Sequence, residues 1–172
     1  MFCNSISDKF VLNLNAVKIK KLVKGLLWTI AILLISSTAV FFYLTDVSKV
    51  NPKTVAFYNQ LKDSLNERGY KADFYIVSCK RPKWFNSILV KLKSGAKPYS
   101  QHLHGNAIDI IVLDVNNDGK SNIADVDLVF DILDKKIVGD SGGVGTYKKM
   151  KGFASKQMIH FDYRGKRARW HH

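Results

Sequence analysis

The sequence predicts an α+β fold, in which a small antiparallel sheet flanked by helices is preceded by one N-terminal transmembrane helix. Three patterns support this prediction. An uncharged apolar run occupies residues 25–45, short segments rich in β-branched residues follow it, and stripes of apolar residues at helical spacing lie between those segments. We therefore expect three parts: a basic cytoplasmic N-terminus at 1–24, a transmembrane signal-anchor helix at 25–45, and one folded domain at 46–172.

The apolar run at 25–45 is long enough to cross a bilayer, which takes about 20 residues. Four lysines precede it, namely Lys18, Lys20, Lys21 and Lys24. By the positive-inside rule they keep the N-terminus in the cytoplasm and place the domain in the periplasm or outside the cell. The alternatives are a cleaved signal peptide with a small-residue site at 37–39, or a buried core helix. The length of the run favours an uncleaved anchor, and a helix that is apolar on every face does not suit the core of a small domain.

In the domain, a first helix is predicted at 51–68, because Asn51 can cap it, Pro52 suits its first turn and Gly69 can end it. A second helix is predicted at 123–137, where apolar residues recur at spacings of three and four. Strands are predicted at 73–78, 107–113, 143–146 and 158–163.

Two histidines and an aspartate have the chemistry of a zinc site: His102, Asp109 and His160. Asp109 falls in a predicted strand, Gly105 allows a tight turn before it, and the small Ala107 on the same strand face leaves room for a metal. A catalytic zinc takes three nitrogen or oxygen ligands from the protein and keeps a fourth position for water. The alternative is a surface histidine and a strand aspartate that bind no metal.

The pattern S-x-H-x-x-G-x-A-x-D at 100–109, followed by a later histidine, resembles the superfamily of zinc peptidases that contains D-Ala-D-Ala peptidases, lysostaphin-type enzymes and the hedgehog N-terminal domain. The segments 142–147 and 158–165 are most similar to the murein endopeptidase K-like branch of cell-wall peptidases. The resemblance runs from about residue 75 to residue 170. It implies that the zinc ligands are His102, Asp109 and His160.

The resemblance implies further roles. Arg81 matches the family arginine that holds carboxylate or carbonyl groups of the substrate, although Cys79 stands where the family has a glycine. The alternative for Arg81 is a solvated cation in a basic loop. The residues at 157–158, where many family members carry a general base, are glutamine and methionine here. Proton transfer is therefore expected from Asp162, from His104, or from a water polarised by zinc alone; Asp162 has the alternative role of orienting a histidine.

A second metal motif occupies residues 114–125 and matches the EF-hand-like calcium loop. Its expected oxygen ligands are Asp114, Asn116, Asp118, the Lys120 carbonyl, Asn122 and Asp125. The motif also resembles one dockerin repeat. A calcium ion would fix the loop that leads into the second helix, and the alternative is an Asn/Asp-rich turn without an ion.

The chain is strongly basic, with a formal net charge of +13 at pH 7. Such a charge attracts polyanions, but no nucleic-acid-binding motif accompanies it and the expected topology places the domain outside the cytoplasm. We therefore expect no nucleic-acid partner; peptidoglycan, other anionic wall polymers and lipid headgroups fit better. The two cysteines, Cys3 and Cys79, would lie on opposite sides of the membrane, so no disulfide is expected.

Together these patterns predict a membrane-anchored zinc metallopeptidase that hydrolyses peptide bonds of peptidoglycan, either as an endopeptidase or as a D-Ala-D-Ala-type carboxypeptidase. A non-catalytic, hedgehog-like zinc and calcium domain that binds cell wall or a protein is one alternative. A calcium-dependent attachment module is another. The segment 84–99 is expected to be a loop that shapes the substrate cleft. Trp170 is expected to close the fold, as the resemblance suggests. The histidines at 171–172 are expected to form a frayed tail.

Overall fold

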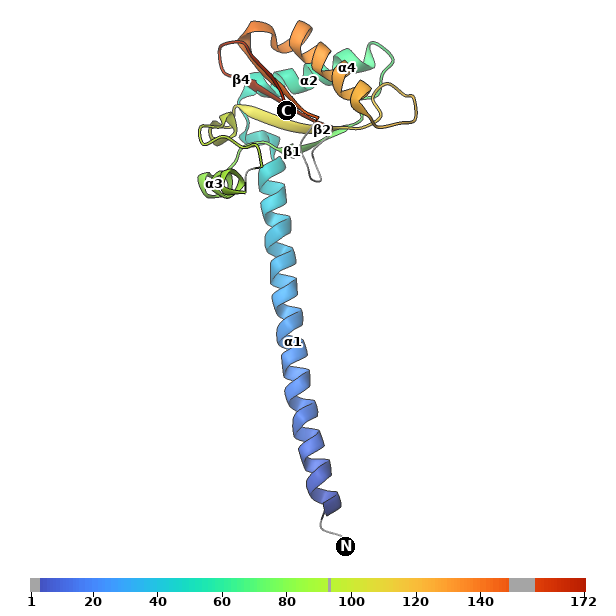
Figure 1. Cartoon of the computed structure of the whole chain (residues 1–172), viewed down its shortest axis with the longest axis vertical. Coiled ribbons are helices and arrows are strands. Elements are labelled where there is room, and N and C mark those ends of the chain that lie inside the picture. Colours follow the sequence, from blue (N-terminus) through green and yellow to red (C-terminus); the bar gives the residue numbers. More distant parts are fainter. Residues whose placement is uncertain (1–3, 93, 149–156) are drawn as a thin grey trace. The chain divides into compact units, whose positions relative to one another are not determined.

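The computed structural model describes residues 4–92, 94–148 and 157–172, with side chains described from residue 18 onward. The chain divides into two compact units, Met1–Phe42 and Tyr43–His172 (Figure 1). Helix α1 (Asn4–Thr45) forms the first unit and continues into the start of the second. Its segment Lys18–Thr45 has a mean hydropathy of 2.1 and is long and apolar enough to span a membrane. None of its apolar window is buried, which distinguishes it from the core helix of a soluble protein.

The second unit confirms the α+β fold and contains a five-stranded sheet in the order β1-β2-β4-β3-β5. The strands are β1 (Phe74–Ser78), β2 (Ala107–Val112), β3 (Gly142–Tyr147), β4 (Met158–Tyr163) and β5 (Ala168–His171). The first four strands pair antiparallel, as predicted, but β5 pairs parallel with β3, so the sheet is mixed. After β4 the chain turns at Gly165, which has a φ of 75°, and reaches the far side of β3 as an edge strand.

Three α-helices belong to this unit: α2 (Pro52–Asn66), α3 (Lys83–Lys91) and α4 (Ile123–Ile132). The Asn51 side chain caps α2 as expected, by accepting a hydrogen bond from the backbone of Lys53. A π-helical turn, Leu133–Val138, continues α4 to one residue beyond the predicted end of the second helix. Helix α3 lies in the segment that was expected to be a loop.

The arrangement of the sheet and helices places α2 and α4 on one side of the sheet and α3 on the other (Figure 1). The core fills the side that faces α2 and α4. Its fully buried members from the sheet include Ile108, Ile110, Val112, Val144, Ile159 and Phe161, and those from the helices include Leu61, Leu65, Val126 and Val129. Burying one such side chain stabilises the fold by about 1.5–3 kcal/mol.

The alternation of side chains along a strand decides what lies on the other face. In β2, Ile108 and Ile110 enter the core, so Asp109 between them points the opposite way. In β4, Ile159 and Phe161 enter the core, so His160 points away from it. The face of the sheet opposite the core therefore collects the polar side chains of the predicted zinc site.

Candidate metal centre

Two neighbouring strands and one turn bring the three predicted zinc ligands together. Asp109 on β2 pairs directly with His160 on β4, so their side chains lie side by side on the same face. His102 comes from the 3-10 turn Gln101–His104, which ends at Gly105 with a φ of 71° just before β2. Ligand atoms of the three residues all lie within 4.8 Å of one another. The three side chains are almost fully buried, with exposed fractions of 1%, 3% and 5% for His102, Asp109 and His160.

Each histidine uses one ring nitrogen to fix its orientation and turns the other toward Asp109. His102 Nδ1 lies 2.5 Å from the carbonyl oxygen of Cys79, and its Nε2 lies 3.1 Å from Asp109 Oδ2. His160 Nε2 lies 2.8 Å from Asp162 Oδ2, and its Nδ1 lies 2.8 Å from Asp109 Oδ1. We call the ring nitrogen that faces Asp109 the inner nitrogen and the other one the outer nitrogen. The Cys79 carbonyl and the Asp162 carboxylate each accept a hydrogen bond from an outer nitrogen and so keep the proton on that atom. When both rings are neutral, their inner nitrogens carry lone pairs.

These inner atoms fit a metal cation. His102 Nε2 and His160 Nδ1 are 3.2 Å apart, and both face the Asp109 carboxylate. Two lone pairs and an anion converge in a buried space, where an unsatisfied polar group costs about 1–3 kcal/mol. A divalent cation among them removes that cost. Two imidazole nitrogens and one carboxylate oxygen are a ligand set that zinc takes in catalytic sites.

The charges around the site keep Asp109 ionised. Burial by itself raises the pKa of this carboxyl, but its interactions with His102 and Arg81 and its hydrogen bonds to the two histidines hold its pKa well below the usual range. Burial lowers the pKa of His102, which favours the neutral ring that a metal needs. Burial also lowers the pKa of His160, but its hydrogen bonds to Asp109 and Asp162 outweigh burial and raise that pKa, so a metal at His160 has to displace a proton. Arg81 donates from Nη2 to Asp109 Oδ2 and from Nε to Ser78 Oγ at 2.8 Å. The structure thus places Arg81 against a candidate metal ligand as well as beside the cavity.

Asp162 lies behind His160, on the side away from Asp109. Its carboxylate is fully buried and accepts hydrogen bonds from the Gly143 backbone at 3.1 Å and from Arg164 Nε at 2.7 Å. Burial raises the pKa of Asp162, but the hydrogen bonds from Arg164 and His160 outweigh it and hold the pKa well below the usual range. A Cβ at position 143 would lie 2.6 Å from Asp162 Oδ2, so the close approach requires glycine there. This placement favours the orienting role for Asp162.

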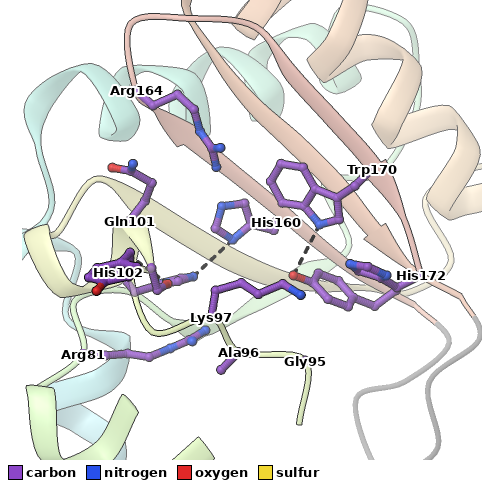
Figure 2. A pocket seen from close by; sticks show the side chains of 13 residues that line it. Arg81, Gly95, Ala96, Lys97, Gln101, His102, His160, Arg164, Trp170 and His172 are labelled. Atoms are coloured by element: carbon purple, nitrogen blue, oxygen red, sulfur yellow. Dashed lines mark hydrogen bonds between the residues drawn. The ribbon is translucent and has the colours of Figure 1, made fainter. Parts of the chain in front are cut away.

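A cavity of about 320 Å³ opens beside the two histidines (Figure 2). Its wall includes His102, His160, Arg81, Arg164, Lys97, Tyr99, Gln101, Tyr147, Trp170 and His172. His104, one of the residues expected to transfer protons, is exposed and lies outside this wall. The wall contains no aspartate or glutamate from the described residues. The chemistry available to a substrate in the cavity therefore comes from cations, aromatic rings and the candidate metal site.

Tyr147 lies on the wall of the cavity, and the sequence motifs predicted no role for its side chain. Its hydroxyl accepts a hydrogen bond from Trp170 Nε1 at 3.4 Å, and burial raises the pKa of this phenol, so it stays protonated and can donate. The Trp170 ring lies 5.2 Å from the His160 ring, centroid to centroid. Gly145 makes this packing possible, because a Cβ there would come within 2.0 Å of the indole. The alternation of Gly143, Gly145 and Tyr147 along β3 was the available sign that this face surrounds a site.

His171 ends strand β5, and His172 after it is hydrogen-bonded to β3, where a frayed tail was expected. His171 Nδ1 lies 2.8 Å from the Thr146 hydroxyl, and the His172 backbone N–H donates to the Thr146 carbonyl at 2.8 Å. His172 also packs on the Tyr147 ring at 5.5 Å and forms part of the cavity wall. They are ordered because β5 extends the sheet beyond β3, a pairing that depends on tertiary contacts.

In the predicted calcium loop, polar side chains accept hydrogen bonds from the backbone of the loop itself. Asp114 Oδ2 accepts from the Gly119 backbone at 3.1 Å, Asn116 Oδ1 from Asp118 at 3.0 Å, and Asp118 Oδ1 from Lys120 at 2.8 Å. Asp114 Oδ1 is buried and has no hydrogen-bond partner among the described residues. An oxygen in that condition is available to a cation.

The end of the loop carries the N-terminal cap of α4. Asn122 accepts from the Ala124 backbone at 2.7 Å, and Asp125 Oδ2 accepts from the Asn122 backbone N–H at 2.9 Å, which makes a capping box. The other oxygen of Asp125 accepts from the backbones of Val115 and Asn116 at 2.9 and 3.0 Å. Asp125 therefore ties the loop to the helix in addition to its expected role as a calcium ligand.

No protein-family model matches the chain, and no curated protein matches it. Among solved structures, the crystal structure of the Serratia marcescens L-Ala D-Glu endopeptidase ChiX is similar, with a TM-score of 0.44 and 18% sequence identity. The match covers 69% of this chain and 84% of that chain.

Proposed function

We propose that the protein is a membrane-anchored zinc metallopeptidase that hydrolyses peptide bonds of peptidoglycan. The observation that carries this proposal is the buried set of His102, Asp109 and His160 beside a cavity, with one nitrogen of each histidine held by an outer acceptor and the other turned inward. The zinc ligands and the relation to the murein endopeptidase K-like branch are part of the proposal. So is the topology, with a cytoplasmic N-terminus and a periplasmic or extracellular domain.

The mechanism assigns separate tasks to the residues around the cavity. When bound, zinc supplies a Lewis acid that lowers the pKa of a water and polarises a carbonyl. Asp162 keeps the proton on Nε2 of His160 and thereby leaves Nδ1 free to act as a ligand. Tyr147, which stays protonated, lies on the cavity wall as a donor to a substrate oxygen. Trp170 covers one side of His160 and limits access of bulk water.

The charge of the cavity fits a peptide that carries carboxylates. Arg81 and Arg164 each pair with an aspartate, Asp109 and Asp162. Lys97 also lines the cavity, and its ammonium has no carboxylate partner among the described residues. Peptidoglycan stem peptides are rich in free carboxylates, so a cationic wall attracts and orients them. Arg81 is proposed to share its guanidinium between Asp109 and the substrate.

We also propose that the loop 114–125 binds calcium in a structural role. The buried Oδ1 of Asp114, which has no hydrogen-bond partner among the described residues, supports this proposal, together with the Asn116 and Asp118 oxygens that the turns of the same loop hold in place. The ion would fix the connection between β2 and α4, and β2 carries Asp109. Calcium would then stabilise the domain without taking part in the chemistry.

The test uses the full-length chain, purified in detergent without added zinc. Metal content and release of fragments from purified peptidoglycan are measured for the wild type, His102→Ala and His104→Ala. We expect about one zinc per chain with cleavage in the wild type, and loss of both in His102→Ala. His104→Ala is the matched control for metal content, because its imidazole comes from the same turn but is exposed.

The other outcomes distinguish the alternatives. Zinc without cleavage of any peptidoglycan preparation would favour the non-catalytic, hedgehog-like binding domain. Absence of zinc from the wild type would contradict the central claim. Zinc retained but cleavage lost in His104→Ala would identify that exposed histidine as the proton carrier despite its place outside the cavity wall.

A further inference from the structure

Helix α3 has an exposed apolar face that the proposed peptidase chemistry does not use. Trp84, Ile88 and Leu92 recur every four residues, so they lie on one side of the helix and of its C-terminal cap. Their exposed fractions are 57%, 44% and 71%. We call these three residues the α3 apolar face. Three large apolar side chains grouped in this way are unusual on a surface that contacts only water.

The opposite side of α3 is attached to the domain. Asn86 is 2% exposed, and its Nδ2 donates to the carbonyl oxygen of Lys97 at 3.0 Å. This hydrogen bond connects α3 to the segment that lines the cavity, which includes Lys97 and Tyr99. The apolar face is therefore the outer side of a fixed helix, and any surface that binds it is also held close to the cavity.

The lysines around the α3 apolar face favour an anionic partner. Lys83 and Lys91 are exposed at the two ends of the helix, and Lys80 precedes it. The sequence of α3, KWFNSILVK, contains no acidic residue. A short amphipathic helix with tryptophan and leucine on one side and lysines beside them is typical of segments that lie in the membrane interface. Each lysine near an anionic lipid surface contributes about 1 kcal/mol.

The chain itself keeps α3 close to the end of the apolar segment. Leu44 belongs to the last turn of α1, and its carbonyl oxygen accepts a hydrogen bond from the Cys79 backbone at 2.5 Å. Both residues are buried in the second unit, with exposed fractions of 8% and 0%. Only Lys80, Arg81 and Pro82 separate Cys79 from the first residue of α3. Four residue steps reach at most about 14 Å, so α3 begins within that distance of Cys79.

We propose that the α3 apolar face inserts into the headgroup region of the same membrane that α1 spans, with its lysines on anionic lipid headgroups. This inference depends on the membrane anchoring in the proposed function but not on the zinc chemistry. A helix that starts within about 14 Å of Cys79, which is hydrogen-bonded to the last turn of the apolar helix, is near enough to reach the interface. Insertion would fix the orientation of the domain and hold the cavity, through Asn86 and Lys97, at a constant distance from the bilayer.

The test places a fluorescent reporter on α3 in the full-length chain. The reporter NBD is attached at Ile88→Cys in a Cys3→Ser background, since Cys79 is buried and does not compete for the label. The protein is reconstituted in vesicles of phosphatidylcholine with one quarter phosphatidylglycerol, some of which contain lipids with a nitroxide near the headgroup. The matched control carries the reporter at Gln60→Cys, an exposed position on α2, across the sheet from α3.

We expect the nitroxide lipids to quench the reporter at position 88 at least about twofold more than the reporter at position 60. Lys83→Glu with Lys91→Glu should reduce that difference, as should vesicles of phosphatidylcholine alone. Equal quenching at the two positions would overturn the proposal. Protection of position 88 from iodide without lipid quenching would also overturn it, because a protein or a second copy would then cover the face.

Two controls separate this proposal from the proposed function. Extraction of the reconstituted protein at alkaline pH reports whether α1 anchors the chain; release from the vesicles would contradict the anchor as well as the docking. Thermal unfolding of each labelled variant, compared with the unlabelled protein, reports whether the domain is folded, whether or not it binds zinc. Retained anchoring and unchanged unfolding with no difference in quenching would contradict the docking of α3 alone.

Discussion

Asp162 affects the proposed metal site through His160 and has no direct contact with the cavity. Its Oδ2 holds the His160 Nε2 proton at 2.8 Å, while Arg164 and the Gly143 backbone occupy its other directions. An outer carboxylate of this kind fixes the tautomer of a histidine ligand and increases its basicity. The three bonds leave Asp162 little freedom to exchange protons with a substrate.

Asp162→Asn should weaken zinc binding by about 10- to 100-fold, because the neutral amide holds the His160 proton less strongly. The measurement is competition for zinc with a chromophoric chelator. Asp131→Asn, which changes an exposed carboxylate paired with Lys135, is the control and should bind zinc normally. Unchanged zinc affinity together with lost cleavage would instead assign Asp162 to proton transfer.

Cys79 should be unreactive in the folded protein. The thiol is buried, and burial raises its pKa to about 12. A raised pKa keeps the thiol protonated as pH rises past 9, where an unfolded cysteine is already mostly thiolate, and the thiolate is the reactive form. In a Cys3→Ser protein we expect alkylation of Cys79 to stay slow from pH 7 to 9 and to become fast only in denaturant. Rapid alkylation without denaturant would contradict the buried position of this residue.

At the scale of the elements, the sequence predicted those features that depend on local pattern. Alternation and caps predicted α2 and β2, and the motif that contains His102 and Asp109 predicted that these two residues lie together, as they do in the candidate site. Helix α3 was taken for a loop because Pro82 provides no side-chain cap and its apolar residues do not face the core. Such a helix has no core stripe that a sequence search can recognise.

Strand β5 shows a different limit of local pattern. It has four residues, without the β-branched alternation that marks a strand, and it pairs in parallel with β3. Its position depends on the space above Gly145, where the Trp170 indole lies. The contribution of Tyr147 and His172 to the cavity follows from this pairing. Contacts between distant segments decide such features, so they could not be predicted from local pattern.

The loop 114–125 gives a prediction for calcium. With a dissociation constant of about 1 mM, 10 mM calcium stabilises the folded state by about 1.4 kcal/mol and raises Tm by about 5 °C. Thermal unfolding with calcium, with the same concentration of magnesium and with chelator measures this effect. Asp114→Asn should remove the response to calcium while zinc content stays normal. An equal Tm in all three conditions would favour the ion-free turn.

At the scale of the whole molecule, the two faces of the sheet differ: one carries apolar side chains and the other carries polar ones. The face toward α2 and α4 supplies the core, and the opposite face supplies the candidate metal site. Helix α3 lies on the side away from α2 and α4 and begins four residues after Cys79, whose backbone N–H is hydrogen-bonded to Leu44. The proposed site and the proposed membrane contact are thus connected by one short segment, 92–100. Lys97 and Tyr99 of this segment line the cavity.

The topology of the full chain provides the last prediction. If α1 is an uncleaved anchor, the N-terminus stays in the cytoplasm and the domain is exported. In spheroplasts, a membrane-impermeant maleimide should therefore label Gln60→Cys, an exposed position, but should label Cys3 only after lysis. The mass of the protein recovered from membranes should include residues 1–45.

The two alternatives for α1 give different results in the same experiment. Cleavage near residues 37–39 would release a protein that lacks Cys3, which mass spectrometry detects directly, and it would contradict both the anchor and the docking of α3. Labelling of Cys3 but not position 60 before lysis would reverse the orientation and place the cavity in the cytoplasm. A cytoplasmic cavity cannot reach peptidoglycan, so that result would contradict the proposed substrate while leaving the metal site unaffected.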